Sequence, residues 1–198
     1  MVIVCDDTRT APAYFTELQR AEKQRVAINV CPAECTGASP QAMLEQAQRK
    51  LKTLANNSDD EDRLEVWLLL DLEGTSERRS QAEEASAQAK RNAGGGQGIK
   101  VARSDPCFEV WTLLHLKDTG KHFADCRQVL ARVRKLWKEG LGQRIRHKAQ
   151  ADYSKIIDRR AEAAARAESH CNNKDPSRTE VFRIIRAIED LAGGAQTA

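Results

Sequence analysis

Two acidic residues, Asp71 and Glu73, follow directly after an apolar run in the segment VWLLLDLEGT, residues 66–75. Side chains two residues apart on a strand point to the same face, so these carboxylates lie side by side if the strand continues through them. Two close carboxylates repel each other unless a cation joins them, and Mg²⁺ prefers carboxylate and water oxygens. We therefore expect a divalent cation at this strand end. The alternative is that the strand stops here and its loop is simply polar.

Further acids lie where another strand and a later helix are expected. Asp6 and Asp7 follow an apolar run at residues 1–5, and Glu109 falls in the first turn of a helix expected after Pro106. A cation held by acids from neighbouring strand ends can activate water and neutralise charge that develops on a phosphate. Each acid also has a structural alternative, because Asp6 and Asp7 can cap the following helix and Glu109 can complement the helix dipole.

The elements that must position these acids are short strands alternating with helices. Apolar runs predict strands over residues 1–5, 25–31, 66–70 and 99–102, and residues with helical spacing or helix-favouring composition lie between them. Continuous apolar strands are typical of a parallel sheet covered by helices, where ligands bind at the carboxyl ends of the strands. We predict an α/β fold with about four mainly parallel strands.

The pattern changes after residue 104. Four helices are expected over residues 107–118, 121–138, 151–170 and 178–192, with no further clear strand. We therefore divide the chain into an α/β core, residues 1–104, and a helical continuation, residues 105–198, that covers or extends the same domain.

The composition is that of an ordinary soluble protein, with 40% hydrophobic and 31% charged residues among 198. No apolar stretch is long enough to span a bilayer, and the opening MVIVCDD lacks the features of a signal peptide, so we expect a cytoplasmic protein without a membrane partner. The six cysteines are scattered and are expected to be free thiols. Cys31 and Cys35 are close in sequence, but no second Cys/His pair completes a zinc pattern.

A basic segment runs from Arg127 to Lys148 and contains only one acid, Glu139. Its cations are Arg127, Arg132, Arg134, Lys135, Lys138, Arg144, Arg146 and Lys148, with Trp137 among them. Such a segment can follow a nucleic-acid backbone by neutralising phosphates. The alternative is an ordinary solvated helix face.

Several segments resemble the RloB-like family, a Toprim-related group. The opening VIVCDDTRTAPAYF resembles the family's first strand and the Thr, Pro and Tyr-Phe that follow it, and DLEGT resembles its Asp-x-Asp strand end. The most specific match is SDPCFEVWTLLHL, which is similar to the family signature Asn-Pro-Cys-Phe-Glu-Leu-Trp-Leu-Leu-Leu-His. The tail matches too, through Tyr153-Ser-Lys155, AEAAARAE and DPSRTEVFRII, so the resemblance covers almost the whole chain.

The resemblance implies a Toprim-like fold and Mg²⁺- or Mn²⁺-dependent cleavage of phosphodiester bonds in bacterial anti-phage defence, often beside a partner ATPase of the ABC or AAA type. The substrate is open between DNA and RNA, including transfer RNA. By position, Asp6, Asp71 and Glu73 correspond to the three Toprim acids that hold the metal. Asp6 stands where the family usually has Glu, and Glu73 where it has Asp. The first side chain is therefore one methylene shorter than in the family and the second one methylene longer, while both negative charges are kept. Glu109 and His115 match the signature helix as further catalytic candidates.

Other interpretations remain beside the nuclease. His115 lies on one helical stripe with Phe108 and Trp111, so it can be a core histidine. Lys155, in the matching tail, is a candidate phosphate contact or a surface lysine. The strand-end acids also resemble those of a phosphoaspartate receiver, although no fifth strand ending in lysine is expected. A third class is a non-catalytic adaptor that binds nucleic acid or an ATPase. A homo-oligomer is compatible with each.

Overall fold

The computed structural model describes residues 1–22, 26–34, 37–56, 65–92, 98–145 and 151–194. The elements follow in the order β1 (Val2–Cys5), α1 (Thr10–Ala21), β2 (Asn29–Pro32), α2 (Pro40–Ala55), β3 (Val66–Asp71), α3 (Ser76–Asn92), β4 (Lys100–Asp105), α4 (Glu109–Leu116), α5 (Cys126–Leu141), the 3₁₀ turns η3 (Tyr153–Lys155) and η4 (Ile157–Arg159), α6 (Arg160–Asn172), β5 (Arg178–Thr179) and α7 (Val181–Gly194). Strands alternate with helices up to β4, as the apolar runs predict.

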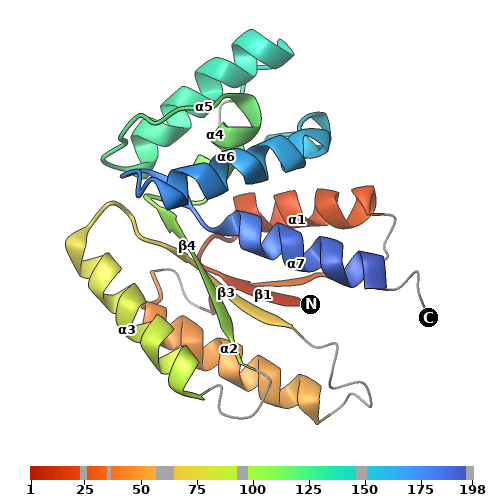
Figure 1. Ribbon diagram of the computed structural model, residues 1–198, viewed down its shortest axis with the longest axis vertical. Helices are drawn as coiled ribbons and strands as arrows, with labels where there is room; N and C mark the ends of the chain where they lie inside the picture. Colours follow the sequence, from red (N-terminus) through yellow and green to blue (C-terminus); the bar gives the residue numbers. More distant parts are fainter. Residues whose placement is uncertain (23–25, 35–36, 57–64, 93–97, 146–150, 195–198) are drawn as a thin grey trace.

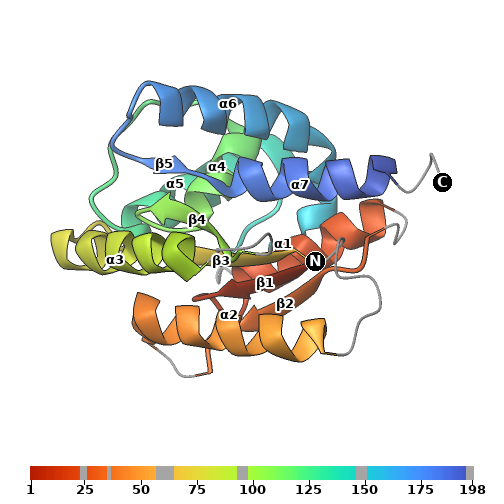
Figure 2. The ribbon, with the colours of Figure 1, turned by 60° about the horizontal axis from the view of Figure 1, so that its bottom comes forward.

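The strands form a five-stranded sheet in the order β2-β1-β3-β4-β5. Figure 1 labels the three central strands, and Figure 2 labels all five. β1 is parallel to both β2 and β3, and β3 is parallel to β4. β5 is antiparallel to β4 and lies at the edge of the sheet. The predicted class is confirmed: this is an α/β fold with a mostly parallel sheet flanked by helices, consistent with a Toprim-like fold.

The predicted helix over residues 178–192 is wrong at its start. Residues 178–179 form β5, and α7 begins at Val181. The hydroxyl groups of Ser104 and Thr179 lie 2.7 Å apart in a buried hydrogen bond that joins β4 to β5. A strand of two residues is too short to show a periodic pattern, which is why about four strands were expected instead of five.

Alternate residues of the central strands face two separate hydrophobic cores. Ile3, Cys5, Trp67 and Leu69 pack with side chains from α1 and from α4 to α7, whereas Val2, Val4, Leu68 and Leu70 pack with side chains from α2 and α3. Figure 1 shows these two helical layers on opposite sides of the sheet, and in Figure 2 α6 and α7 lie on one side of the strands and α2 on the other. Both faces of β1 and β3 are therefore buried, which explains their continuous apolar sequences.

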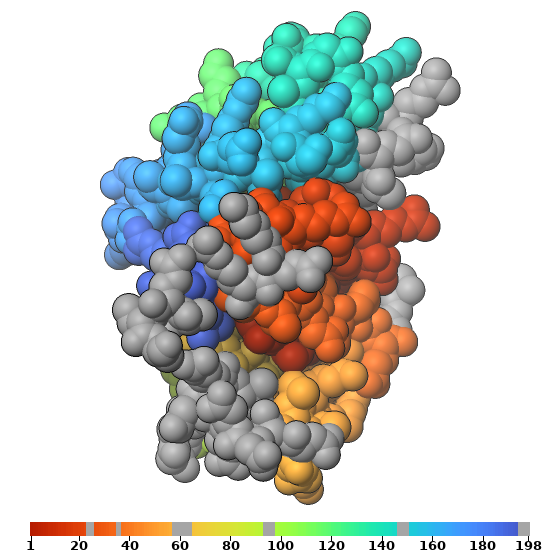
Figure 3. Space-filling model, turned by 90° about the vertical axis from the view of Figure 1, so that its right-hand side faces the viewer, coloured from red at the N-terminus to blue at the C-terminus, as the bar shows by residue number. Residues whose placement is uncertain are grey.

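The C-terminal half builds much of one layer. α4 packs against α5 and α6, and α6 packs against α7. On the face drawn in Figure 3, α5 forms one end of the molecule and is followed by α6, α1 and α2. This half also supplies β5 to the sheet, and the boundary at residue 104 stays a prediction. Within the described ranges, no helix combines the length and the apolar character needed to cross a bilayer.

Candidate functional site

Acidic residues gather at the carboxyl edge of the sheet. Asp6 follows β1, Asp71 ends β3 and Asp105 ends β4. The buried thiol of Cys5 lies among these groups: its pKa is raised first by burial and then by the nearby carboxylates of Asp7, Asp71 and Asp6. The strand ends thus place Asp6 and Asp71 near the same thiol, and their role as ligands of one metal stays a prediction.

Arg78, on the first turn of α3, links the ends of β1 and β3. Its guanidinium forms an ion pair with the Asp6 carboxylate, and the two side chains are only 11% and 13% exposed. The same group donates to the main-chain oxygen of Asp71 at 3.2 Å and to that of Ala38 at 2.8 Å. A cation of the protein itself therefore neutralises part of the acidic edge. Sequence reasoning missed Arg78 because helix periodicity does not identify a partner 72 residues away.

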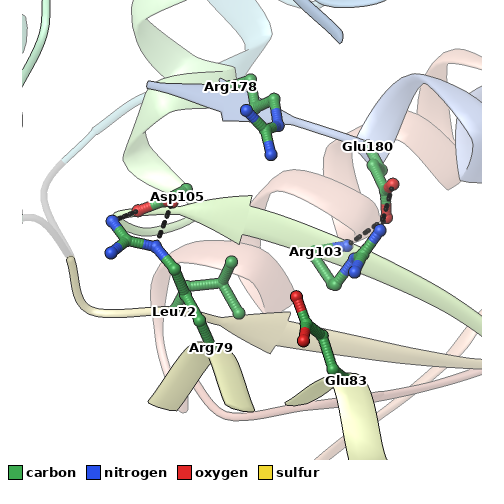
Figure 4. A pocket seen from close by; sticks show the side chains of 7 residues that line it. All are labelled: Leu72, Arg79, Glu83, Arg103, Asp105, Arg178 and Glu180. Carbon is green, nitrogen blue, oxygen red and sulfur yellow. Dashed lines mark hydrogen bonds and ion pairs between the residues drawn. The ribbon is translucent and has the colours of Figure 1, made fainter. Parts of the chain in front are cut away.

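The next residue, Arg79, pairs with the acid at the end of β4. Its Nε and Nη2 donate to the two carboxylate oxygens of Asp105 at 2.9 and 3.2 Å. Figure 4 shows this pair on the wall of a cavity of about 60 Å³ that also carries the Arg103–Glu180 pair. The other charged side chains on its wall are Glu83 and Arg178. Three arginines and three acids line this cavity, so its charges are balanced.

Asp7 serves the start of α1. Its Oδ2 accepts hydrogen bonds from the main-chain N–H groups of Ala11, at 2.9 Å, and of Thr10, and its Oδ1 accepts from that of Arg9 at 3.2 Å. These N–H groups have no partner within the helix, so the carboxylate stabilises the helix terminus. The capping alternative holds for Asp7, whereas Asp6 binds Arg78.

Asp71 and Glu73 do not continue one strand. β3 ends at Asp71, whose Oδ1 accepts from the main-chain N–H of Phe108 at 2.9 Å. Glu73 is exposed in a turn with a φ of 52°, and its N–H donates to the carbonyl of Pro106 at 2.7 Å. The extended conformation needed to set the two carboxylates side by side therefore stops before Glu73. This is a correction to the strand geometry expected from the sequence.

Gly74 explains the turn. Its φ is 73°, and a Cβ there would lie 2.0 Å from the carbonyl oxygen of Ala124, which is main chain and cannot move aside cheaply. Glycine is required both by the left-handed conformation and by this close approach. The turn thus ends β3 abruptly and directs the chain into α3.

Substitution of Gly74 should be costly. We expect Gly74→Ala to lower the free energy of unfolding by about 3 kcal/mol, since a left-handed backbone penalty adds to the steric overlap. Gly142→Ala is the matched control, because Gly142 has a φ of 66° and open space around its Cβ position. It should lose only about 1 kcal/mol. Chemical denaturation measures both values, and equal losses would contradict a steric role for Ala124.

Glu109 begins α4 and is buried, with 2% exposure. The Thr10 hydroxyl donates to its Oε1 at 3.1 Å, and the sulfur of Cys126 lies 3.6 Å from its Oε2. A small cavity of about 10 Å³, near the size of one water, is lined by Glu109, Thr10, Tyr153 and Arg134 among others. The Glu109 carboxylate is therefore held by surrounding side chains, and interaction with the helix dipole alone does not describe its role.

Cys107 and Cys126 form a disulfide across 19 residues, with their Cα atoms 5.8 Å apart. The expectation of six free thiols is therefore wrong for this pair, because the fold places the starts of α4 and α5 together. Cys5, Cys31 and Cys171 are free. Cys35 lies outside the described residues, so the structure does not describe the Cys31–Cys35 pair.

The same two sulfur atoms and Glu109 form a group that could hold a metal ion. One ligand atom from each of Cys107, Glu109 and Cys126 lies within 4.8 Å of the others. Among the residues that the structure describes, no other group of three or more His, Cys, Asp or Glu side chains has its ligand atoms within 4.8 Å of one another. The atoms of Asp6, Asp71 and Glu73 do not form an equally close set.

His115 occupies the core of the helical layer. Its residue exposure is 1%, its Nδ1 lies 2.9 Å from the Trp111 carbonyl and its Nε2 lies 3.2 Å from the Tyr14 hydroxyl. Burial, the largest effect, lowers the pKa of His115 from 6.5 to about 4. The ring is therefore neutral at pH 7, and its surroundings match the core-histidine interpretation.

This burial predicts acid sensitivity. Unfolded chains bind a proton at His115 near pH 6.5, whereas the folded protein does so only near pH 4. Stability from the neutral ring is complete above pH 6.5 and falls by about 3 kcal/mol as the pH drops to 4. Denaturation of the wild type and of His115→Gln at several pH values tests this. The stability difference between them should shrink on acidification, and a constant difference would contradict it.

The basic residues of α5 face solvent. The helix buries Val129, Val133 and Trp137, and its cations lie on other faces. Arg134, Lys135 and Lys138 are exposed, Arg132 is half-buried, and Arg144 is exposed just after the helix; Arg146 and Lys148 lie outside the described residues. Lys155 is exposed in η3. α5 begins at Cys126 beside Glu109, so the helix that carries these cations starts next to a buried carboxylate.

Comparison with known proteins gives one finding. A family model described as RloB-like protein matches residues 1–188. No curated protein and no solved structure gives a significant match.

Proposed function

The chain belongs to the RloB-like family, and we propose that it is a metal-dependent nuclease that cleaves phosphodiester bonds in DNA or RNA. The observation that carries this proposal is that the Arg78 guanidinium binds both the Asp6 carboxylate and the main-chain oxygen of Asp71, so the ends of β1 and β3 lie within reach of one cation. This edge is where parallel α/β sheets bind ligands. Arg78 neutralises only part of the negative charge at this edge. A phosphate that arrives adds more negative charge, which supports binding of a further cation.

The donor atoms at this edge suit a hard cation. Asp6, Asp71 and Glu73 offer carboxylate oxygens, which Mg²⁺ and Mn²⁺ prefer. We propose these three as the ligands, with Glu73 contributing from its exposed turn. When bound, the ion would activate water and neutralise charge on the phosphate.

The remaining roles belong to side chains of the protein. Arg78 orients Asp6 and supplies a fixed positive charge next to Asp71. Glu109, held by Thr10, is proposed to position water or a second ion. Arg132, Arg134, Lys135, Lys138, Arg144, Arg146, Lys148 and Lys155 are proposed to bind the nucleic-acid backbone, and His115 is proposed to act by packing the helix that carries Glu109.

The cellular setting is proposed from the family alone. We propose that the chain works in the cytoplasm as an effector of bacterial anti-phage defence, with a partner ATPase of the ABC or AAA type. Transfer RNA is one candidate substrate. A phosphoaspartate receiver is less well supported, since the fifth strand among the described residues is a short antiparallel edge strand that ends in Thr179 and not in lysine.

The Arg78–Asp6 ion pair also favours a second candidate. An arginine that permanently occupies the place of a metal would leave a non-catalytic adaptor that binds nucleic acid or an ATPase. To separate the nuclease from the adaptor, the purified chain is incubated with pools of DNA and RNA, with and without Mn²⁺ and any ATPase that is encoded next to it. Products that require Mn²⁺ support the nuclease. Binding without any cleavage in every mixture supports the adaptor.

The basic face of α5 should control the salt dependence of binding. We expect a triple alanine variant of Arg134, Lys135 and Lys138 to flatten the slope of log affinity against log salt by about 2 to 3. The matched control replaces Lys50, Lys52 and Lys90, three exposed cations on α2 and α3. Fluorescence anisotropy at several salt concentrations measures the slopes. Equal slopes for both triple variants would contradict a role for α5.

A further inference from the structure

Cys107, Glu109 and Cys126 bring two sulfur atoms and a carboxylate to one place outside the Asp6–Asp71 region. Their ligand atoms lie within 4.8 Å of one another, and Cys107 and Glu109 are buried while Cys126 is half-buried. We propose that this group, with both cysteines reduced, binds a thiophilic divalent cation such as Zn²⁺. The site is separate in chemistry from the proposed magnesium site, because it offers sulfur in place of an all-oxygen set.

The donor types favour zinc over magnesium. Thiolates are soft ligands that select Zn²⁺, whereas Mg²⁺ takes oxygen ligands in octahedral geometry. Two thiolates and one carboxylate give three protein ligands and three negative charges, which leaves a fourth position for water in a tetrahedral site. The buried carboxylate and the two thiolates repel one another. A divalent cation therefore stabilises this buried group more than it would stabilise the same three ligands at an exposed position.

The spacing of the group also fits. Tetrahedral zinc with bonds of about 2.3 Å to sulfur and about 2.1 Å to oxygen places those two ligands about 3.6 Å apart. The Cys126 sulfur lies 3.6 Å from Oε2 of Glu109. The Thr10 hydroxyl donates to the other oxygen, Oε1, so it fixes the carboxylate in the way that outer hydrogen bonds orient metal ligands.

Cation binding and the disulfide exclude each other. The Cys107–Cys126 bond uses both sulfurs, so a thiol reductant must first supply two electrons and two protons while it becomes a disulfide itself. Binding of the cation then releases the protons of the two thiols. The sulfurs must separate to about 3.8 Å around zinc. Rotation about the Cα–Cβ bonds allows this separation with Cα atoms 5.8 Å apart.

The site would act on the loop that holds the acidic edge. Cys107 directly precedes Phe108, whose N–H binds Asp71, and Cys126 begins α5. A bound cation would therefore join the starts of α4 and α5 in place of the disulfide. Glu109 is shared with the proposed nuclease, whereas Asp6 and Asp71 take no part, so cation binding by the two thiolates can be measured whether or not the chain cleaves nucleic acid.

Cobalt titration tests the proposal without any activity assay. The full chain is reduced, freed of reductant without oxygen, and titrated with Co²⁺, whose bonds to thiolate absorb in the near ultraviolet. We expect one Co²⁺ per chain, displacement of the absorption by Zn²⁺, and no such absorption in the oxidised protein. Cys107→Ser and Cys126→Ser should each weaken binding by about 100-fold or more, and Glu109→Gln by about 10-fold or more.

The control is Cys171→Ser, which removes a free cysteine away from the group and should bind as the wild type does. Circular dichroism establishes that each variant is folded, and the oxidised wild type provides a folded protein with the same sequence. Absence of thiolate absorption in the reduced wild type would overturn the proposal. Equal absorption in Cys107→Ser would also overturn it.

Discussion

Asp71→Asn is expected to lower the rate of Mn²⁺-dependent phosphodiester cleavage by about 10³-fold. The amide keeps an oxygen that accepts the hydrogen bond from the Phe108 N–H, so the end of β3 retains its anchor. The substitution removes the negative charge that Asp71 offers to the cation. Initial rates on labelled DNA and RNA, measured under conditions in which the wild type cleaves, give the ratio.

Asp190→Asn is a suitable control for this variant. Asp190 is exposed on α7, and its replacement removes the same charge without touching the carboxyl edge of the sheet. Its cleavage rate should stay within about twofold of the wild type. If folded Asp71→Asn cleaves as fast as Asp190→Asn, the proposed metal ligand is wrong.

Arg78→Ala is expected to have the second large effect. Its guanidinium and the Asp6 carboxylate are both nearly buried, and removing one partner leaves the other charge uncompensated. The free energy of unfolding should fall by about 3 kcal/mol in the absence of divalent ions. Because Asp6 then lacks its cation, Mn²⁺ should raise the melting temperature of this variant more than that of the wild type.

The control is Arg91→Ala, which removes an exposed arginine from the last turn of the same helix. It should change stability by less than about 0.5 kcal/mol and respond to Mn²⁺ as the wild type does. Thermal melts with and without Mn²⁺ compare all three proteins. An Arg78→Ala variant that Mn²⁺ does not stabilise would favour the adaptor, since Asp6 would then bind no metal even without its arginine.

The centre of the sheet was predictable because β1 and β3 are buried on both faces. The continuous apolar sequences of β1 and β3 are the direct result of two hydrophobic cores, one on each side. The positions of Asp6 and Asp71 at strand ends follow from where those runs stop. β5 was not predictable in the same way, since Arg178 and Thr179 become a strand only by pairing with Asp105 and Ser104.

The geometry around Glu73 depended on a contact far along the chain. The spacing of Asp71 and Glu73 suits a strand, but Gly74 lies so close to the carbonyl of Ala124 that only a left-handed glycine fits. The turn therefore begins before Glu73. A glycine shortly after a strand is a turn signal, and here it outweighs the alternation of acids.

Partners of charged and sulfur-containing side chains were the least predictable feature. Arg78 and Asp6 are separated by 72 residues, and Cys107 and Cys126 by 19. Helix propensity places Arg78 on α3 and leaves the direction of its side chain open. Only the packing of α3 beside the strand ends, and of α4 against α5, creates these contacts.

Direct measurement of Mn²⁺ binding tests the proposed metal site most closely. The electron paramagnetic resonance signal of free Mn²⁺ is followed during titration of the wild type and of the double variant Asp6→Asn, Asp71→Asn, with the cysteines kept oxidised so that Cys107 and Cys126 cannot bind the ion. We expect the wild type to bind Mn²⁺ and the double variant to bind it at least about 100-fold more weakly. Equal affinity in the two proteins would show that the strand-end acids do not hold the metal.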